Sequence, residues 1–139
     1  MINAAHRLTV ATGGKGLYEF TGEVERWLAA LRIKTGLLTV FVQHTSASLV
    51  IQENADPDVQ TDLKRFFERV APEDPRHYVH SAEGPDDMPA HIRSALTQTS
   101  LSIPVAGGTL ALGTWQGIYL FEHRSGPHRR SVVLQAFGE

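Results

Sequence analysis

"LLTVFVQHTSASLVIQENADPDV", residues 37–59, contains the pattern on which the predicted fold rests. Residues 37–43 are apolar and β-branched and carry no helix start or stop signal, which predicts a well-buried strand. Residues 48–53 predict a second strand that pairs with the first, with "HTSA" at the bend between them. A bend at this place would let His44 face a cleft.

Three helices are predicted around this stretch. Residues 21–36 have an amphipathic pattern, and Gly36 stands where the helix or its following turn would end. Asp56 and Pro57 predict the start of a second helix, because Asp can cap a helix and Pro fits its first position. Pro89 opens the third predicted helix, which continues in "AHIRSALTQT".

Strands are predicted near both ends of the chain. Residues 6–12 alternate loosely, and the C-terminal part contains "SLSIPV", "TLALG", "GIYLFEHR" and "RSVVLQAF". Gly107 and Gly108 predict a tight turn between the first two of these segments. Helices in the middle and strands at the ends favour an α+β fold over alternating βαβ units. We therefore expect one domain over residues 1–139, a largely antiparallel β-sandwich with two or three helices.

Composition argues against several classes of protein. The net charge of −2 over 139 residues disfavours a dedicated nucleic-acid binder. No apolar run approaches the roughly 20 residues that span a bilayer, so no membrane partner is expected. The absence of cysteine excludes disulfides and thiolate metal sites. The N-terminal sequence lacks a signal-peptide pattern, and a cytoplasmic location is predicted.

Histidine is the unusual component, with seven residues. His44 follows a predicted buried strand, His80 lies in an irregular segment, and His91 lies early in the third helix. Neutral imidazole is the commonest protein ligand for transition metals, and catalytic zinc often uses three protein ligands. From the residues alone, a metal site and scattered hydrogen-bonded histidines are both open interpretations.

Carboxylates and hydroxyls add further candidates. Glu83, Asp86 and Asp87 precede the third helix and suit either Mg²⁺ binding or helix capping, with capping the expected role of Asp87. Ser46 and Ser48 suggest a nucleophile, but the GxSxG pattern that exposes such a serine is absent.

The segment "GTWQGIYLFEHR", residues 113–124, combines two kinds of polar residue. Trp115 offers a flat stacking face and Gln116 a donor and an acceptor, although these residues alone slightly favour a bulge with a core Trp. Glu122 and Arg124 share a face with apolar residues of the predicted strand. Such a charged pair is costly unless it is paired or functional, or unless the strand ends in water.

The order of motifs resembles the YjbQ-like family, often described as secondary thiamine-phosphate synthase enzymes. The motifs are "GKGLYEFT", "HTSASLVIQENADPDV", "YVHSAEGPDDMPAHI", "SLSIPV" and "LGTWQGIYLFEHR", within a resemblance from about Gly14 to Glu139. The resemblance implies a compact α+β fold built on a β-sandwich, a homotrimer, and a pocket that contains a metal.

Motif by motif, the resemblance also implies which residues form the site. The metal would be bound by His44, His80 and His91, and the pocket would contain Glu122 and Arg124 as catalytic residues. A small-molecule substrate would contact the hydroxyl residues of the HTSAS motif and the WQ pair, that is Thr45, Ser46, Ser48, Trp115 and Gln116.

The implied reaction joins hydroxymethylpyrimidine diphosphate to thiazole phosphate and releases pyrophosphate. Three imidazoles favour zinc or a similar ion, whereas the Mg²⁺ that a diphosphate substrate would bring prefers oxygen ligands. One alternative is therefore a metal-dependent hydrolase with Glu122 as general base. The other is a trimer without enzymatic activity that binds a small anion or metabolite.

Overall fold

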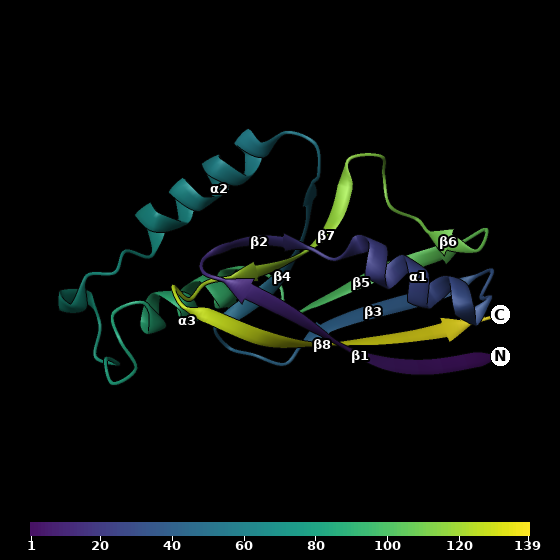
Figure 1. Ribbon diagram of the computed structural model, residues 1–139, viewed down its shortest axis with the longest axis horizontal. Coiled ribbons are helices and arrows are strands. Elements are labelled where there is room, and N and C mark those ends of the chain that lie inside the picture. The colour runs from purple at the N-terminus through teal and green to yellow at the C-terminus, as the bar shows by residue number, and fades with distance from the viewer.

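Two antiparallel sheets enclose the core in the computed structural model, which describes residues 1–139 (Figure 1). The larger sheet contains, in spatial order, β1 (Ile2–Gly13), β8 (Pro127–Gly138), β3 (Gly36–Val42), β5 (Ser100–Ala106) and β6 (Thr109–Leu110). The smaller sheet contains β2 (Gly16–Glu19), β7 (Gln116–Glu122) and β4 (Ala47–Glu53). With the helices described below, this is the predicted α+β fold.

The three predicted helices are present as α1 (Thr21–Leu31), α2 (Pro57–Val70) and α3 (Asp87–Leu96), with a short 3₁₀ turn at Pro75–His77. The start of α2 is confirmed, because the Asp56 carboxylate accepts a hydrogen bond from the Asp58 N–H and Pro57 occupies the first turn. α3 begins at Asp87, two residues before the predicted start at Pro89. No helix is long and apolar enough to cross a membrane.

Gly36 has a different role from the predicted helix end. α1 ends at Leu31, and Gly36 is the first residue of β3, paired with Gly138 on β8. A Cβ atom at Gly36 would lie 2.2 Å from the Phe137 carbonyl oxygen. Close approach of the two backbones therefore requires glycine at this crossing.

β3 is buried on one face only, so it is less buried than the well-buried strand predicted here. Leu38 and Val40 are fully buried, whereas Leu37 and Phe41 are 43% and 44% exposed. Because side chains alternate along a strand, the larger sheet has one face against the core and one uncovered face.

β4 is present as predicted but does not pair with β3. It joins the smaller sheet, where Ala47 pairs with Glu122 of β7. The segment that links β3 to β4, which contains His44, is therefore a crossover between the two sheets. The predicted turn at Gly107 and Gly108 is confirmed, and both glycines have positive φ angles.

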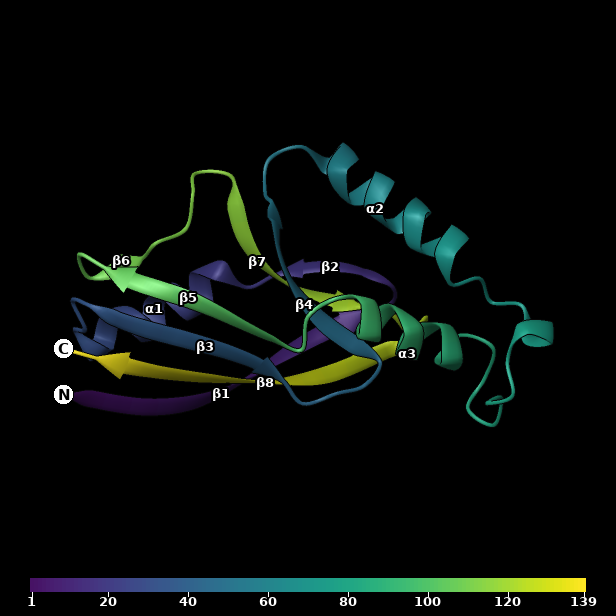
Figure 2. The ribbon, with the colours of Figure 1, turned by 180° about the vertical axis from the view of Figure 1, so that it is seen from behind.

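The core lies between the two sheets and beneath α1, which packs Val24 and Leu28 into it. α2 extends away from the sheets, as both ribbon views show (Figures 1 and 2). It is attached through the Phe67 ring, which packs edge-on against Phe121 at 5.3 Å between centroids. α3 packs beside β4, so the start of α3 comes close to the ends of β4 and β7.

Candidate metal centre

Four side chains with metal-binding atoms converge at the start of α3. His80, Glu83, Asp87 and His91 each offer one such atom, and these atoms lie within 4.8 Å of one another. Asp87 and His91 are four residues apart, which places them on the same face of the helix. His80 and Glu83 come from the irregular segment that leads into α3. The local chain therefore brings together two imidazoles and two carboxylates.

The His91 ring has its protonation pattern set by the backbone. Its Nδ1 lies 2.9 Å from the Thr45 carbonyl oxygen, which can only accept, so Nδ1 carries a hydrogen. Its Nε2 lies 3.0 Å from Asp87 Oδ2. In a neutral His91, this nitrogen and this oxygen are both lone-pair donors, and their contact needs a proton or a cation between them. A carbonyl that binds the second ring nitrogen is the usual arrangement behind a metal-binding histidine.

Both imidazoles approach the same carboxylate oxygen. His80 Nε2 lies 2.7 Å from the same Asp87 Oδ2 that contacts His91. Nitrogen and oxygen ligands bound at about 2.0–2.2 Å to one tetrahedral ion lie roughly 3.3–3.6 Å from each other, so these atoms would move apart by roughly 0.3–0.9 Å to bind one. The chemistry of the donor set, two imidazoles beside two carboxylates, fits a divalent metal.

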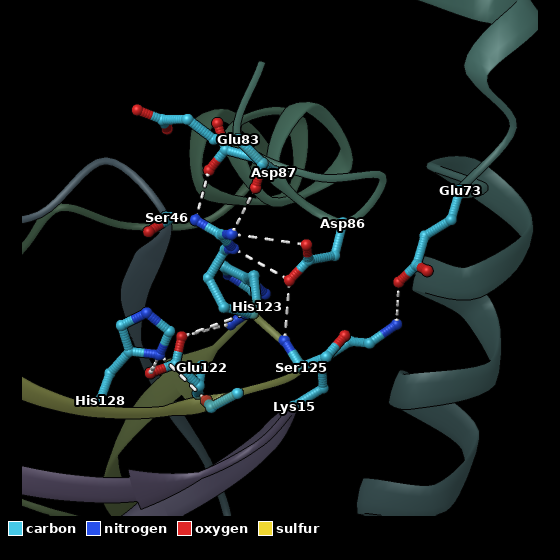
Figure 3. Close-up of polar contacts among 12 residues, drawn as sticks. Lys15, Ser46, Glu73, Glu83, Asp86, Asp87, Glu122, His123, Ser125 and His128 are labelled. Carbon is cyan, nitrogen blue, oxygen red and sulfur yellow. Dashed lines mark hydrogen bonds and ion pairs between the residues drawn. The ribbon is translucent and has the colours of Figure 1, made fainter. Parts of the chain in front are cut away.

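Asp86 and Asp87 are both bound by Arg124, which follows β7. Arg124 Nε donates to Asp86 Oδ2 at 2.9 Å, and Nη1 donates to Asp87 Oδ1 at 2.8 Å. Burial alone would raise the pKa of Asp86, but the hydrogen bonds from Arg124 and the Ser125 N–H lower it to about 2. Figure 3 shows Asp86 facing the turn that contains Ser125. Asp87 makes no capping hydrogen bond, contrary to its predicted role.

His44 lies outside the four-residue cluster. Its Nε2 accepts a hydrogen bond from the Ser131 N–H at 2.8 Å, and its Nδ1 lies 3.4 Å from Arg130 Nη1. Burial and the Arg130 cation both lower the pKa of His44 below its ordinary value. One ring nitrogen is thus occupied and the other faces a cation, so within one protomer His44 does not join His80 and His91 as a ligand.

Glu122 is a buried structural carboxylate in this fold. It is 0% exposed and accepts hydrogen bonds from Arg130 and from the Thr12 hydroxyl. The N–H groups of His123 and Arg124 also donate to it. Burial would raise the pKa of Glu122, but these donors hold it below its ordinary value. Its lone pairs are all engaged, which leaves none for the predicted general-base role.

The hydroxyl residues of the HTSAS motif divide into two groups. Thr45 and Ser46 line an open hollow of about 470 Å³. A neighbouring hollow of about 340 Å³ is bordered by Thr45, His44 and His91, which connects this surface to the cluster. Ser48, in contrast, is 1% exposed and its hydroxyl lies 2.8 Å from the buried His123 ring, so it belongs to the core.

Trp115 and Gln116 lie at the other end of β7 from the cluster. Gln116 and Glu122 are the two ends of β7 and lie six residues apart, which at about 3.3 Å per strand residue places them about 20 Å apart. Trp115 is 62% exposed, so it is not a core residue, and the Gln116 side chain accepts from the Gly113 N–H. Within one protomer, the WQ pair and the histidine cluster are therefore separate surfaces.

The metal ligands predicted from the sequence do not include Asp87 and Glu83. Both residues are candidates for cation binding in the sequence, but the predicted role of Asp87 is the helix cap. The sequence signal for this cluster is the spacing of Asp87 and His91, which puts a carboxylate and an imidazole one turn apart on the same helix.

Comparison with known proteins identifies relatives of one family over nearly the whole chain. The model of the family described as "UPF0047 protein YjbQ-like" matches residues 6–139. UPF0047 protein sll1880 of Synechocystis is 59% identical over 95% of this chain and 90% of its own, and UPF0047 protein YjbQ of Escherichia coli O157:H7 is 45% identical over 95% and 96%.

Solved structures have the same architecture. The crystal structure of the hypothetical protein APE1520 from Aeropyrum pernix K1 matches with a TM-score of 0.88 and 35% identity, covering 98% of this chain and 99% of its own. The conserved hypothetical protein TT1486 from Thermus thermophilus matches with a TM-score of 0.82 and 37% identity, covering 95% and 99%.

Proposed function

This chain belongs to the YjbQ-like UPF0047 family. From the geometry of the histidine and carboxylate cluster, we propose that it is a metal-dependent hydrolase of a small substrate. The observation that carries the proposal is the contact between His91 Nε2 and Asp87 Oδ2, at 3.0 Å, while His91 Nδ1 is bound to a carbonyl. A bound divalent cation would satisfy both atoms.

The proposed ligands are His80, Asp87 and His91. Two imidazoles and a carboxylate suit zinc or a similar transition ion, and three protein ligands are typical of catalytic sites. When bound, such an ion would supply a hydroxide nucleophile at neutral pH, because metals of this kind lower the pKa of bound water to about 7. Glu83 is the exposed carboxylate of the cluster and is the residue that we assign to proton transfer.

The proposed substrate surface is the pair of open hollows beside His91. Thr45 and Ser46 line it, together with His44 and Thr99. These side chains offer hydrogen bonds without a free charge, because the nearby Arg130 is paired with Glu122. This surface suits a small polar substrate whose reacting group lies at the metal.

Thiamine-phosphate synthesis is the second candidate reaction. It is favoured by Asp87 and Glu83, because carboxylate oxygens are the ligands that Mg²⁺ prefers when it binds a diphosphate. Incubation with hydroxymethylpyrimidine diphosphate, thiazole phosphate and Mg²⁺ separates the two reactions. Product formation supports synthesis, whereas zinc-dependent cleavage of small esters supports hydrolysis. Tight metabolite binding without turnover would support a binding protein.

Replacing His91 by alanine is expected to weaken zinc binding at least tenfold, because one ligand nitrogen is removed. Zinc affinity is measured by competition with a chromophoric chelator, with circular dichroism as a check on folding. His77→Ala is the matched control, because His77 is an exposed histidine three residues from His80 and outside the cluster. Equal zinc affinity in the two variants, or no zinc binding by the wild-type protein, would rule out this metal centre.

We also propose that the chain assembles as a homotrimer and acts in the cytoplasm on a small molecule, without a nucleic-acid or membrane partner. The homotrimer is supported by the uncovered face of the larger sheet. Leu37, Phe41 and Phe137 expose 43%, 44% and 52% of their surface there. Such apolar residues on one sheet face are typical of a protein interface.

Replacing Phe41 by aspartate is expected to reduce the trimer to monomers, because a charge would be buried in the proposed interface. Light scattering coupled to size-exclusion chromatography gives the mass. Val70→Asp is the control, since it makes the same kind of change at an exposed apolar position on α2. A monomeric wild-type protein, or a trimer that persists in Phe41→Asp, would count against this interface.

A further inference from the structure

We infer that Arg124 is a positioning residue that orients Asp87 and holds the loop of metal ligands in place, rather than a catalytic group that binds substrate. The inference rests on the proposed function, because it supposes a metal at the start of α3. It adds to the proposed ligands a residue that fixes their orientation without binding the metal.

The contacts of Arg124 use every nitrogen of its guanidinium. Nε donates to Asp86 and Nη1 donates to Asp87, at 2.9 and 2.8 Å. Nη2 donates to the Glu83 backbone carbonyl at 2.8 Å. One side chain thus binds three residues of the segment that provides the ligands, and it has no free edge with which to bind an anionic substrate.

The contact with Asp87 determines which oxygen can reach a metal. Oδ1 is bound to Arg124, while Oδ2 faces the imidazoles of His80 and His91. A carboxylate with one oxygen fixed in this way presents the other in a single direction. Groups that hold a ligand by its second atom are known to change metal affinity by about 10–100-fold.

Arg124 is itself anchored to the rigid part of the fold. Its backbone N–H donates to the buried Glu122, which is bound to Arg130 on β8. The next residue, Ser125, donates its N–H to Asp86 at 2.9 Å. The turn between β7 and β8 therefore holds the irregular segment before α3, and such support can give a loop ligand a fixed position.

The charge of Arg124 and its positioning role predict opposite effects on metal affinity when the side chain is removed. Arg124 is a cation close to a cation site, so by Coulomb repulsion alone its removal should strengthen metal binding. If it positions Asp87, its removal should weaken metal binding. Lysine at this position keeps the charge but loses the fork that binds Asp86 and Asp87 together. The two variants thus separate the two roles.

The test measures Zn²⁺ and Co²⁺ affinity in the full-length wild-type protein and in Arg124→Ala, Arg124→Lys and Arg129→Ala. Arg129 is an exposed arginine on β8 and controls for the loss of one positive charge. We expect about 10–100-fold weaker binding in both Arg124 variants, by analogy with other groups that orient ligands, and an altered Co²⁺ absorption spectrum. Arg129→Ala should bind as the wild-type protein does.

Millimolar methylguanidinium adds a readout that general loss of structure would not give. It should restore metal affinity to Arg124→Ala, where the side-chain space is open, and leave Arg124→Lys unchanged. Wild-type affinity or tighter in both Arg124 variants would overturn the positioning role. If Arg124→Ala fails to fold, Arg124→Lys alone decides. Absence of metal binding in the wild-type protein would instead overturn the proposed function, so the two failures are distinguishable.

Discussion

Glu122→Gln is expected to lower the free energy of unfolding by about 3–5 kcal/mol, the usual effect of removing one partner from a buried ion pair. Glu122 is 0% exposed and Arg130 is 4% exposed. Glutamine keeps the shape of the side chain but removes its charge, which leaves the Arg130 guanidinium buried without a counter-ion. Equilibrium unfolding in urea measures the change.

Two further variants test this explanation. Glu68→Gln changes a carboxylate that is 52% exposed and pairs with Lys15 and Arg93. Solvent screens both pairs, so the free energy of unfolding should fall by less than in Glu122→Gln. Arg130→Met combined with Glu122→Gln should recover part of the loss, because the unpaired charge is then absent. If Glu122→Gln were no less stable than Glu68→Gln and lost only catalytic rate, Glu122 would be a general base after all.

Acid is expected to destabilise the protein through His123, by about 2 kcal/mol between pH 7 and pH 5. Burial, with a smaller effect of the Arg93 cation, lowers the pKa of His123 to about 3. An unfolded histidine has a pKa of about 6.5. Below about pH 6.5 the unfolded chain therefore takes up a proton that the folded chain excludes until about pH 3. Stability is complete above this window and is lost as the pH falls through it.

Urea unfolding at pH 5, 6 and 7 measures this loss. In His123→Gln the decrease between pH 7 and pH 5 should be smaller than in the wild-type protein by about 2 kcal/mol, since glutamine does not titrate. The glutamine amide can still bind Ser48. His77→Gln, at an exposed position, should retain the wild-type decrease. An unchanged pH dependence in His123→Gln would show that another group causes it.

The fold could be predicted to the extent that its signals are local. The Asp56–Pro57 helix start and the glycine turn at 107–108 depend on residues next to each other, and both are present. The partner strand of β4 could not be predicted in this way, because apolar β-branched residues pair equally well with any strand of similar composition. Its true partner, β7, is more than sixty residues away in the chain, where periodicity gives no information.

The candidate site could be predicted in part for the same reason. His80 and His91 are expected as ligands from the motif resemblance, because residue type alone leaves seven histidines as candidates. Asp87 is harder to assign, because the same residue type favours both a helix start and a metal. The environments of His44 and Glu122 depend on Ser131 and Arg130 of β8, which meet them only through sheet pairing.

The segment between β3 and β4 links the histidine cluster to both sheets. Thr45, whose carbonyl orients His91, is tethered on one side to the larger sheet and on the other to the smaller one. Any slippage of one layer over the other would turn the imidazole away from Asp87. The geometry of a bound metal would therefore depend on the alignment of the two sheets. A substitution that loosens the packing between the sheets would then speed the exchange of that metal with solution.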